Sequence, residues 1–180
     1  MLGYANIKLV NYFYKGGNNT MFDIGDKVVY PMHGAGVITS VENKHVNNKD
    51  SKYLIVQMVV GSMIIMIPET NVEHVGLREI ISKDKLRVIE EILQNKELTK
   101  EPMVNWNKRS NLYIEQIKSG DIYQVATVVN ILIQKERHKK ISTGERRILN
   151  TGRQILLSEL SLVCKRDYHD MQEWLDKISS

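Results

Sequence analysis

The chain has 180 residues, of which 42% are hydrophobic and 26% are charged, and its formal net charge is +4 at pH 7. This length fits one domain or two small ones, and this composition is ordinary for a globular protein. No apolar run approaches the roughly 20 residues that span a bilayer, and the single cysteine, Cys164, excludes an internal disulfide framework and suits a reducing cytoplasm.

The first twenty residues pattern poorly, whereas a dense and well-patterned region begins at Met21. The codons of Lys15, Gly16 and Gly17 can read AAA-GGA-GGN, which resembles a bacterial ribosome-binding site upstream of a methionine codon. We therefore expect translation to start at Met21 and residues 1–20 to be a leader without function. A flexible N-terminal arm is the alternative.

From Met21 to about His74 the sequence predicts strands. Four short runs are rich in Val, Ile and Tyr, and turn residues separate them: DKVVY, GVITSVEN, YLIVQMVV and MIIMI. Gly61 and Ser62 suit a two-residue hairpin, because glycine adopts positive φ without strain. The MHGAG segment lacks the lysine and the following helix of a phosphate loop, so we interpret it as a turn. Strands this short and regular predict a small antiparallel barrel or a strongly bent sheet.

After Gly76 the apolar residues recur with the period of helices. Ser142 and Glu145 have the spacing of a capping box. The predicted helices run through KDKLRVIEEIL after Ser82, from about Trp106 to Lys118, from Asp121 through Ile133, from Ser142 to about Cys164, and from roughly Tyr168 to Ile178. The chain is therefore expected to hold a β module at residues 21–76 and an all-α module of four to five helices at residues 77–180.

Basic charge is concentrated in the predicted helical module. Residues 101–166 hold 12 Lys and Arg against 6 Asp and Glu, whereas residues 21–100 hold 10 against 11. A basic cluster of this kind is typical of proteins that bind a polyanion, because each contact of a cation with a phosphate releases counterions. A solvated basic surface with no nucleic-acid partner explains the same numbers equally well.

Catalytic and metal-binding patterns are missing from the sequence. The histidines are scattered, with no pair at i,i+4 and no cysteine pair nearby to complete a zinc site: His33, His45, His74, His138 and His169. Cys164 falls late in an apolar helical pattern, which favours a buried small hydrophobe over a nucleophile. Neither G-x-S-x-G nor H-E-x-x-H occurs. We expect no enzyme, no metal, no cofactor and no small-molecule substrate.

The order of motifs resembles the CarD/CdnL family of bacterial transcription regulators from Met21 to about Leu162. The N-terminal motifs are FDIGDKVVYPMHGAGVI, the Pro68–Glu69 turn after MIIMI, and VGLRE; a similar module occurs in the transcription-repair coupling factor. The C-terminal motifs are NWNKR, SGD, VATVV, ISTGERRIL and RQILLSEL, and their order is specific to the family. The resemblance implies a Tudor-like barrel of about five strands followed by a helical domain.

The resemblance implies that the β module binds the RNA polymerase β subunit through a strand edge, which is the mode called β-augmentation. The matching positions are Lys44, Met63, Ile64, Ile65, Met66, Ile67 and Pro68. The family often carries an arginine where Met66 stands, so one salt bridge is missing here, although a pairing made by backbone groups is unaffected. The alternative for Met66 is a strand residue packed on the barrel.

The resemblance also implies that Trp106 wedges into the minor groove at the upstream edge of the transcription bubble. An indole ring can fill space beside a distorted base step and oppose its restacking. Lys108 and Arg109 are expected to hold the phosphates that position the ring, without reading sequence. The family often has another basic residue where Asn111 stands, which weakens this clamp here. Trp174 has no neighbouring cations and is interpreted as packing.

Three helix residues, Arg146, Arg147 and Arg153, either reach DNA or simply solvate the module, and we take Arg146 and Arg147 as DNA candidates. The expected function is a monomeric cytoplasmic regulator, associated with the nucleoid through polymerase, that binds polymerase and promoter DNA just upstream of the −10 element. It is expected to favour the open promoter complex. The alternatives are a polymerase-binding scaffold without DNA contact and an enzyme with an unrecognised site.

Overall fold

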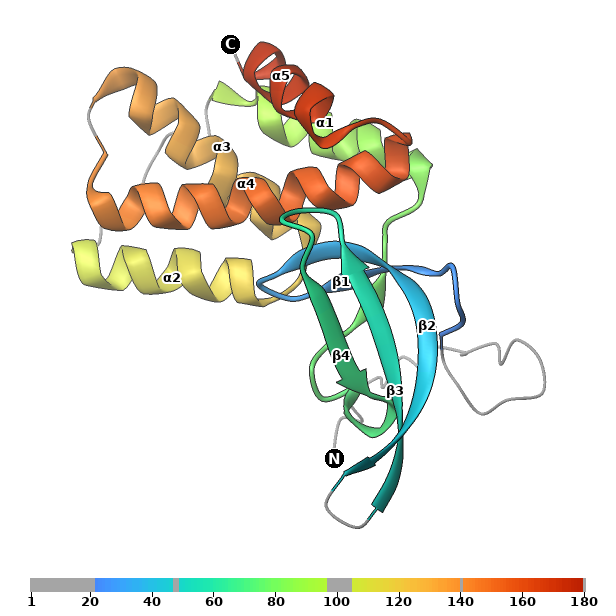
Figure 1. Cartoon of the computed structure of the whole chain (residues 1–180). Helices are drawn as coiled ribbons and strands as arrows, with labels where there is room; N and C mark the ends of the chain where they lie inside the picture. The colour runs from blue at the N-terminus through green and yellow to red at the C-terminus, as the bar shows by residue number, and fades with distance from the viewer. Residues whose placement is uncertain (1–21, 47–48, 97–104, 140, 180) are drawn as a thin grey trace, which may run out of the picture.

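The computed structural model describes residues 22–46, 49–96, 105–139 and 141–179. Within these ranges a five-stranded antiparallel sheet precedes five α-helices, which confirms the predicted fold class and its order along the chain (Figure 1). The expectation for residues 1–20 lies outside the described residues. Among the helices described, none combines the length and the apolar character that crossing a membrane requires.

The sheet consists of β1 (Lys27–Tyr30), β2 (Gly34–Val46), β3 (Lys49–Met58), β4 (Ile64–Pro68) and β5 (Arg78–Glu79). Its strand order is β4-β3-β2-β1-β5, so β4 and β5 form the two edges and the sheet stays open instead of closing into a barrel. A register shift between Ile38 and Ser40 bends the long strand β2, as a bulge does. The bent sheet, one of the two predicted forms, is therefore the one observed.

Two details of the sheet differ from the sequence expectation. The connection between β3 and β4 takes residues 59–63 and not two residues, and both Gly61 (φ 79°) and Ser62 (φ 52°) within it adopt left-handed backbone conformations. The fifth strand, β5, pairs with Val28 and Val29 of β1. The sheet thus extends beyond residue 76, where the sequence suggested that the β module ends.

The helices are α1 (Leu86–Gln94), α2 (Trp106–Lys118), α3 (Ile122–His138), α4 (Thr143–Cys164) and α5 (Tyr168–Ile178). Side chains cap most of their starts: Asn105 accepts from the Lys108 N–H, and Ser142 forms with Glu145 the predicted capping box. Ser82 does not open an α-helix. It precedes a 3₁₀ turn at Lys83–Lys85 and makes no capping hydrogen bond.

Helix α3 lies at the centre of the helical module and contacts α1, α2 and α4. Its predicted apolar face is buried throughout: Val125, Val128, Val129, Leu132 and Ile133. Asn130 is also fully buried, and its amide donates to the carbonyls of Ile92 and Asn95 at the end of α1. Gly152 lets α4 approach α3 closely, because a Cβ there would lie 2.8 Å from Val129 Cγ2. Together these contacts make α3 the core of the module.

The turn between β1 and β2 packs against α4 and joins the sheet to the helices. Gly34 has φ 96°, and a Cβ on it would lie 2.4 Å from Ser158 Oγ. The same hydroxyl accepts a hydrogen bond of 2.8 Å from the Ala35 N–H. The MHGAG segment therefore begins in a turn, as predicted, at Met32 and His33, and its first glycine, Gly34, opens β2 and permits contact with the helical module.

Candidate functional sites

Strand β4 offers a free backbone edge. It pairs with β3 alone among the strands that the structure describes, with Ile65 opposite Val56 and Met66 opposite Ile55. The Met58 N–H donates to the Met63 carbonyl at 2.9 Å, and this bond fixes which pairs along the ladder are hydrogen-bonded. Because hydrogen-bonded and non-hydrogen-bonded pairs alternate, Ile65 directs its backbone groups to β3 and Met66 directs them outward.

The remaining β4 residues follow the same alternation. Ile64 and Pro68 share the outward phase with Met66, whereas Ile67 shares the inward phase with Ile65. Proline is suited to an outward position on an edge strand because it has no N–H to donate. We define the outward backbone groups of Ile64, Met66 and Pro68 as the β4 edge.

The side chains of this strand divide into two sets. Ile64 and Met66 are 60% and 53% exposed, and neighbouring Met63 is 38% exposed. Ile67 is buried, and Ile65 packs against the core of the sheet. The exposed Met66 does not fit the alternative of a packed barrel residue. Apolar side chains beside an open strand edge are a liability unless a partner covers them.

Lys44 lies on β2 opposite Ser51 of β3. Here the hairpin of β2 and β3 forms an arm that projects past the end of β4 (Figure 1). The Lys44 ammonium forms an ion pair of 3.1 Å with Glu42, and the two side chains are 37% and 46% exposed. This exposed pair leaves Lys44 accessible to a partner that approaches the β4 edge from the tip of the arm.

The first turn of α2 carries the expected DNA residues, and they differ in their surroundings. Trp106 is the first helical residue, but its side chain lies outside what the structure describes. Lys108 and Asn111 are exposed to solvent. The Arg109 side chain is only 17% exposed and turns toward Glu145, with 3.9 Å between Nη2 and Oε1. Of the two expected phosphate contacts, Lys108 is the accessible one.

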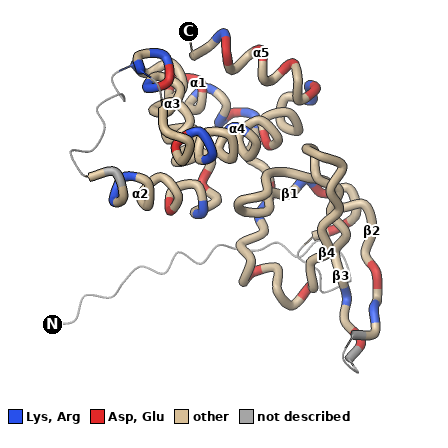
Figure 2. The backbone as a smooth tube through the Cα atoms, turned by 60° about the vertical axis from the view of Figure 1, so that its left-hand side comes forward, with Lys and Arg blue, Asp and Glu red and all other residues tan. Residues whose placement is uncertain are grey.

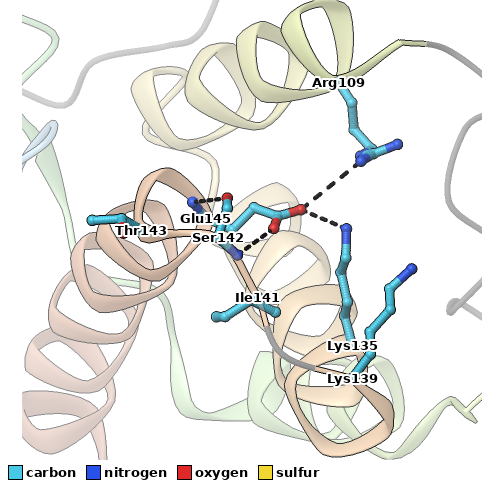
Figure 3. A pocket seen from close by; sticks show the side chains of 7 residues that line it. All are labelled: Arg109, Lys135, Lys139, Ile141, Ser142, Thr143 and Glu145. Atoms are coloured by element: carbon cyan, nitrogen blue, oxygen red, sulfur yellow. Dashed lines mark hydrogen bonds and ion pairs between the residues drawn. The ribbon is translucent and has the colours of Figure 1, made fainter.

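A pocket of about 520 Å³ lies where the first turns of α2 and α4 meet the end of α3 (Figure 3). It is lined by Arg109, Lys135, Lys139, Ile141, Ser142, Thr143 and Glu145. Lys139 is exposed, and Figure 3 marks no hydrogen bond or ion pair between it and the other six residues drawn. The sequence analysis did not single out Lys135 or Lys139, although their i,i+4 spacing directly before the capping box was a usable signal.

Glu145 joins three helices inside this pocket. Its carboxylate accepts from Lys135 Nζ at 2.5 Å and from the Ser142 N–H at 2.9 Å, and it faces Arg109. Burial alone would raise the pKa of Glu145, but the hydrogen bonds from Lys135 and from Ser142 outweigh burial and lower this pKa below its ordinary value. The sequence predicted only its capping role, because Lys135 and Arg109 come from other helices.

The expected arginines of α4 lie on different sides of the module. Arg146 and Arg147 are exposed in the first turn, near the start of α2, and Arg146 forms an ion pair of 2.7 Å with Glu136. Arg153 lies further along and faces Asp176 of α5 at 3.7 Å. Figure 2 shows basic residues gathered at the start of α2 and where α3 passes into α4. We define this group as the basic end: Lys108, Arg109, Lys135, Lys139, Arg146 and Arg147.

The described residues contain no group of three or more His, Cys, Asp and Glu that could hold a metal ion. Cys164 is half-buried against the helical core, and this burial raises the pKa of its thiol. A thiol with a raised pKa is a poor nucleophile near neutral pH. Packing is therefore the better interpretation of this residue.

Comparisons with known proteins agree with the arrangement of a sheet followed by helices. Residues 22–81 match the family model described as the CarD-like/TRCF RID domain, and residues 88–176 match the model described as the CarD C-terminal domain. The chain is also 32% identical over 143 residues to YdeB of Bacillus subtilis (strain 168), which is described as a candidate transcription factor. That match covers 79% of this chain and 92% of YdeB.

Proposed function

The chain belongs to the CarD family of transcription regulators, and we propose that it binds both the RNA polymerase β subunit and promoter DNA and thereby stabilises the open promoter complex. This family consists of transcription factors and not of enzymes, and its N-terminal domain has a Tudor-like fold. In the proposed function, the protein binds polymerase as a monomer in the cytoplasm and needs no cofactor.

The β4 edge is the proposed polymerase site. The outward backbone groups of Ile64 and Met66 are free to pair with a strand of the β subunit. The exposed side chains of Met63, Ile64 and Met66 would bury apolar surface against the partner. Ile65 and Ile67 pack on the core of the sheet and hold the strand in place. Pro68 ends this edge, and Lys44 lies beyond it in the β2–β3 arm, where it offers a charge to the β subunit.

The basic end is the proposed DNA site. Lys108, Arg146 and Arg147 are exposed and suited to contact phosphates, and Lys139 joins them from the neighbouring helix. Arg109 supports this surface from beneath by pairing with Glu145. Trp106 opens α2 at the same end, where its indole is proposed to wedge into the minor groove just upstream of the −10 element.

Two weak sites on one chain explain how such a protein acts. Binding to polymerase tethers the basic end close to the promoter, so that its intrinsic affinity for DNA need not be high. Stabilisation of the open complex requires that the protein bind the open form more tightly than the closed form. A difference of about 1–3 kcal/mol corresponds to a shift of roughly 5- to 150-fold in that equilibrium.

The observation that carries the proposal is one molecule with an open, apolar strand edge on its sheet and a cluster of accessible cations at the start of α2 and α4. A polymerase-binding scaffold without DNA contact is the second candidate. It is favoured by Arg109 and Arg146, whose charges are already engaged by Glu145 and Glu136.

A footprint of the polymerase–promoter complex distinguishes the two candidates. We expect the full chain to add protection directly upstream of the −10 element, and Lys108→Ala to weaken this protection in a manner that depends on salt. The exposed Lys85 of the 3₁₀ turn before α1 provides a matched control, because Lys85→Ala removes the same charge outside the basic end. Polymerase binding with an unchanged footprint would favour the scaffold.

A further inference from the structure

A partly buried ion pair joins the sheet to the helical module outside both proposed binding sites, with Arg78 30% exposed and Glu159 beneath it. Glu159 of α4 is completely buried. Its two carboxylate oxygens accept from Arg78 Nη1 at 2.7 Å and from Arg78 Nη2 at 2.8 Å, and one oxygen also accepts from the Ile81 N–H at 2.9 Å. The remaining edge of the guanidinium is engaged as well, because Arg78 Nε donates to the Gly120 carbonyl at 2.8 Å.

These bonds bring together four segments that are distant in sequence. Arg78 lies on β5, Ile81 on the connection to α1, Gly120 in the turn between α2 and α3, and Glu159 on α4. We call this set the junction cluster. Two further bonds cross the same boundary, from the Ala35 N–H to Ser158 Oγ and from Lys27 Nζ to the Leu162 carbonyl. α4 therefore contacts the sheet along its final turns through polar contacts of defined direction.

The turn at Gly120 is held from a second side. Pro31, in the β1–β2 turn, lies 3.5 Å from the point where a Cβ on Gly120 would be, and 3.4 Å from the equivalent point on Gly76. Gly120 follows Ser119, the residue that caps the end of α2, and has φ 71°. Contacts from β5 and from the β1–β2 turn thus hold the end of α2, the helix whose first turn bears Trp106.

Such a cluster is better suited to fixing an orientation than to adding stability. Removing two charges from water costs about as much as their attraction returns, so a buried ion pair is weak evidence for stability. A bidentate pair between a guanidinium and a carboxylate adds geometric specificity, because both planar groups must align. Apolar contacts, being non-directional, tolerate sliding and rotation that this pair does not.

The cluster lies between the two proposed sites. In Figure 1, α4 crosses the sheet near β1 and β2, the free strand β4 lies on one side of this crossing, and α2 and α4 extend away from it toward their first turns. The basic end is therefore at the far end of two long helices. A small rotation at the junction would move it substantially relative to the β4 edge.

We propose that Arg78 and Glu159 are positioning residues that lock the sheet and the helical module into one orientation. Their effect on transcription rests on the proposed function, whereas the lock itself is a property of the free protein. The orientation of the two modules in the free protein and its effect on the open complex can be measured separately. Glu159→Gln is the most informative variant, because an amide keeps the size of the side chain but opposes one N–H₂ group to the guanidinium.

The lock is tested first in the free, full-length protein by pulsed electron–electron double resonance, which measures the distance between two spin labels. Spin labels are attached at Asn43→Cys on β2 and Glu115→Cys on α2, both exposed, in a Cys164→Ser background. We expect one narrow distance distribution, broadened or shifted by Glu159→Gln. Arg78→Lys, which keeps the charge but loses the planar fork, should broaden it less. Glu91→Gln, which breaks the exposed Arg87–Glu91 pair, should leave it unchanged.

A distribution that stays equally narrow in folded Glu159→Gln and Arg78→Lys proteins would overturn the lock. The second measurement uses polymerase and promoter DNA. Glu159→Gln should bind polymerase as the wild type does, because the β4 edge is intact, and should shorten the open-complex lifetime about 5-fold or more. Full retention of this lifetime would overturn the positioning role. If the wild type itself fails to lengthen the lifetime, the proposed function fails while the distance measurement still stands.

Discussion

At the scale of single residues, two neighbouring cations of α2 are expected to behave differently when replaced. Lys108 is exposed, so Lys108→Ala should reduce the slope of log affinity for DNA against log salt by about one unit. Arg109 is mostly buried beside Glu145, so Arg109→Ala should instead lower the free energy of unfolding, by about 1–3 kcal/mol. Salt titrations and urea denaturation of both variants check this, and equal slopes for the two would refute the distinction.

Glu145 should make the free energy of unfolding depend on pH in the acidic range. Its pKa is lower in the folded protein than its ordinary value of 4.5, so the charged form stabilises the fold above that pH. This contribution is lost as the pH falls through the folded pKa. Glu145→Gln should therefore destabilise the protein at neutral pH and flatten the fall in unfolding free energy below about pH 5. Urea denaturation over a pH series measures this, with the exposed Glu115→Gln as the control; an unchanged slope would contradict it.

The residues that the sequence did not reveal are those whose partners lie far away in the chain. Glu145 was predictable as a cap because the capping box is local, but its contacts with Lys135 and Arg109 depend on how three helices pack. The proximity of Lys108 and Arg109 in sequence suggested one shared role. Adjacent helix residues point in different directions, so Lys108 faces solvent and Arg109 faces the Glu145 carboxylate.

At the scale of elements, the β4 edge predicts different results for two substitutions at one position. Met66→Pro removes an outward N–H without breaking the bonds between β3 and β4, so polymerase binding should be lost in a folded protein. Met66→Arg keeps the backbone and should bind at least as tightly as the wild type. Binding to the β subunit and a melting curve for each variant test this prediction.

Ile65→Pro is the contrasting change. It removes an N–H that points to β3, so it should lower the melting temperature as well as polymerase binding. If folded Met66→Pro still binds the β subunit at full strength, β4 is not the polymerase-binding edge.

Elements with local signals were predictable and those without were not. α3 and α4 begin directly after Asp121 and Ser142, whose side chains cap the first turn of each helix. β5 has only two residues, both polar, and exists because it pairs with β1 far earlier in the chain. Ser82 shows the limit of a local signal, because it precedes a 3₁₀ turn, and not the predicted α-helix, and makes no capping hydrogen bond.

At the scale of the whole molecule, the structure joins parts that the sequence presented as two modules. The change from strands to helices near Gly76 was visible because the apolar period changes there. The contact between them was not visible, since it is made by single residues that are distant in sequence, among them Gly34 with Ser158 and Arg78 with Glu159. Under the proposed function, the orientation of the two modules sets where the basic end meets DNA once the β4 edge is bound.

The lifetime of the polymerase–promoter open complex tests most directly whether the protein bridges its two partners. Saturating wild type should lengthen this lifetime, by at most the roughly 5- to 150-fold shift of the opening equilibrium. Trp106→Ala should lose most of that effect, with polymerase affinity, melting temperature and the salt slope for DNA unchanged, because the change removes a ring and no charge. No lengthening by the wild type, or full lengthening by Trp106→Ala, would contradict a bridge that stabilises the open complex through this residue.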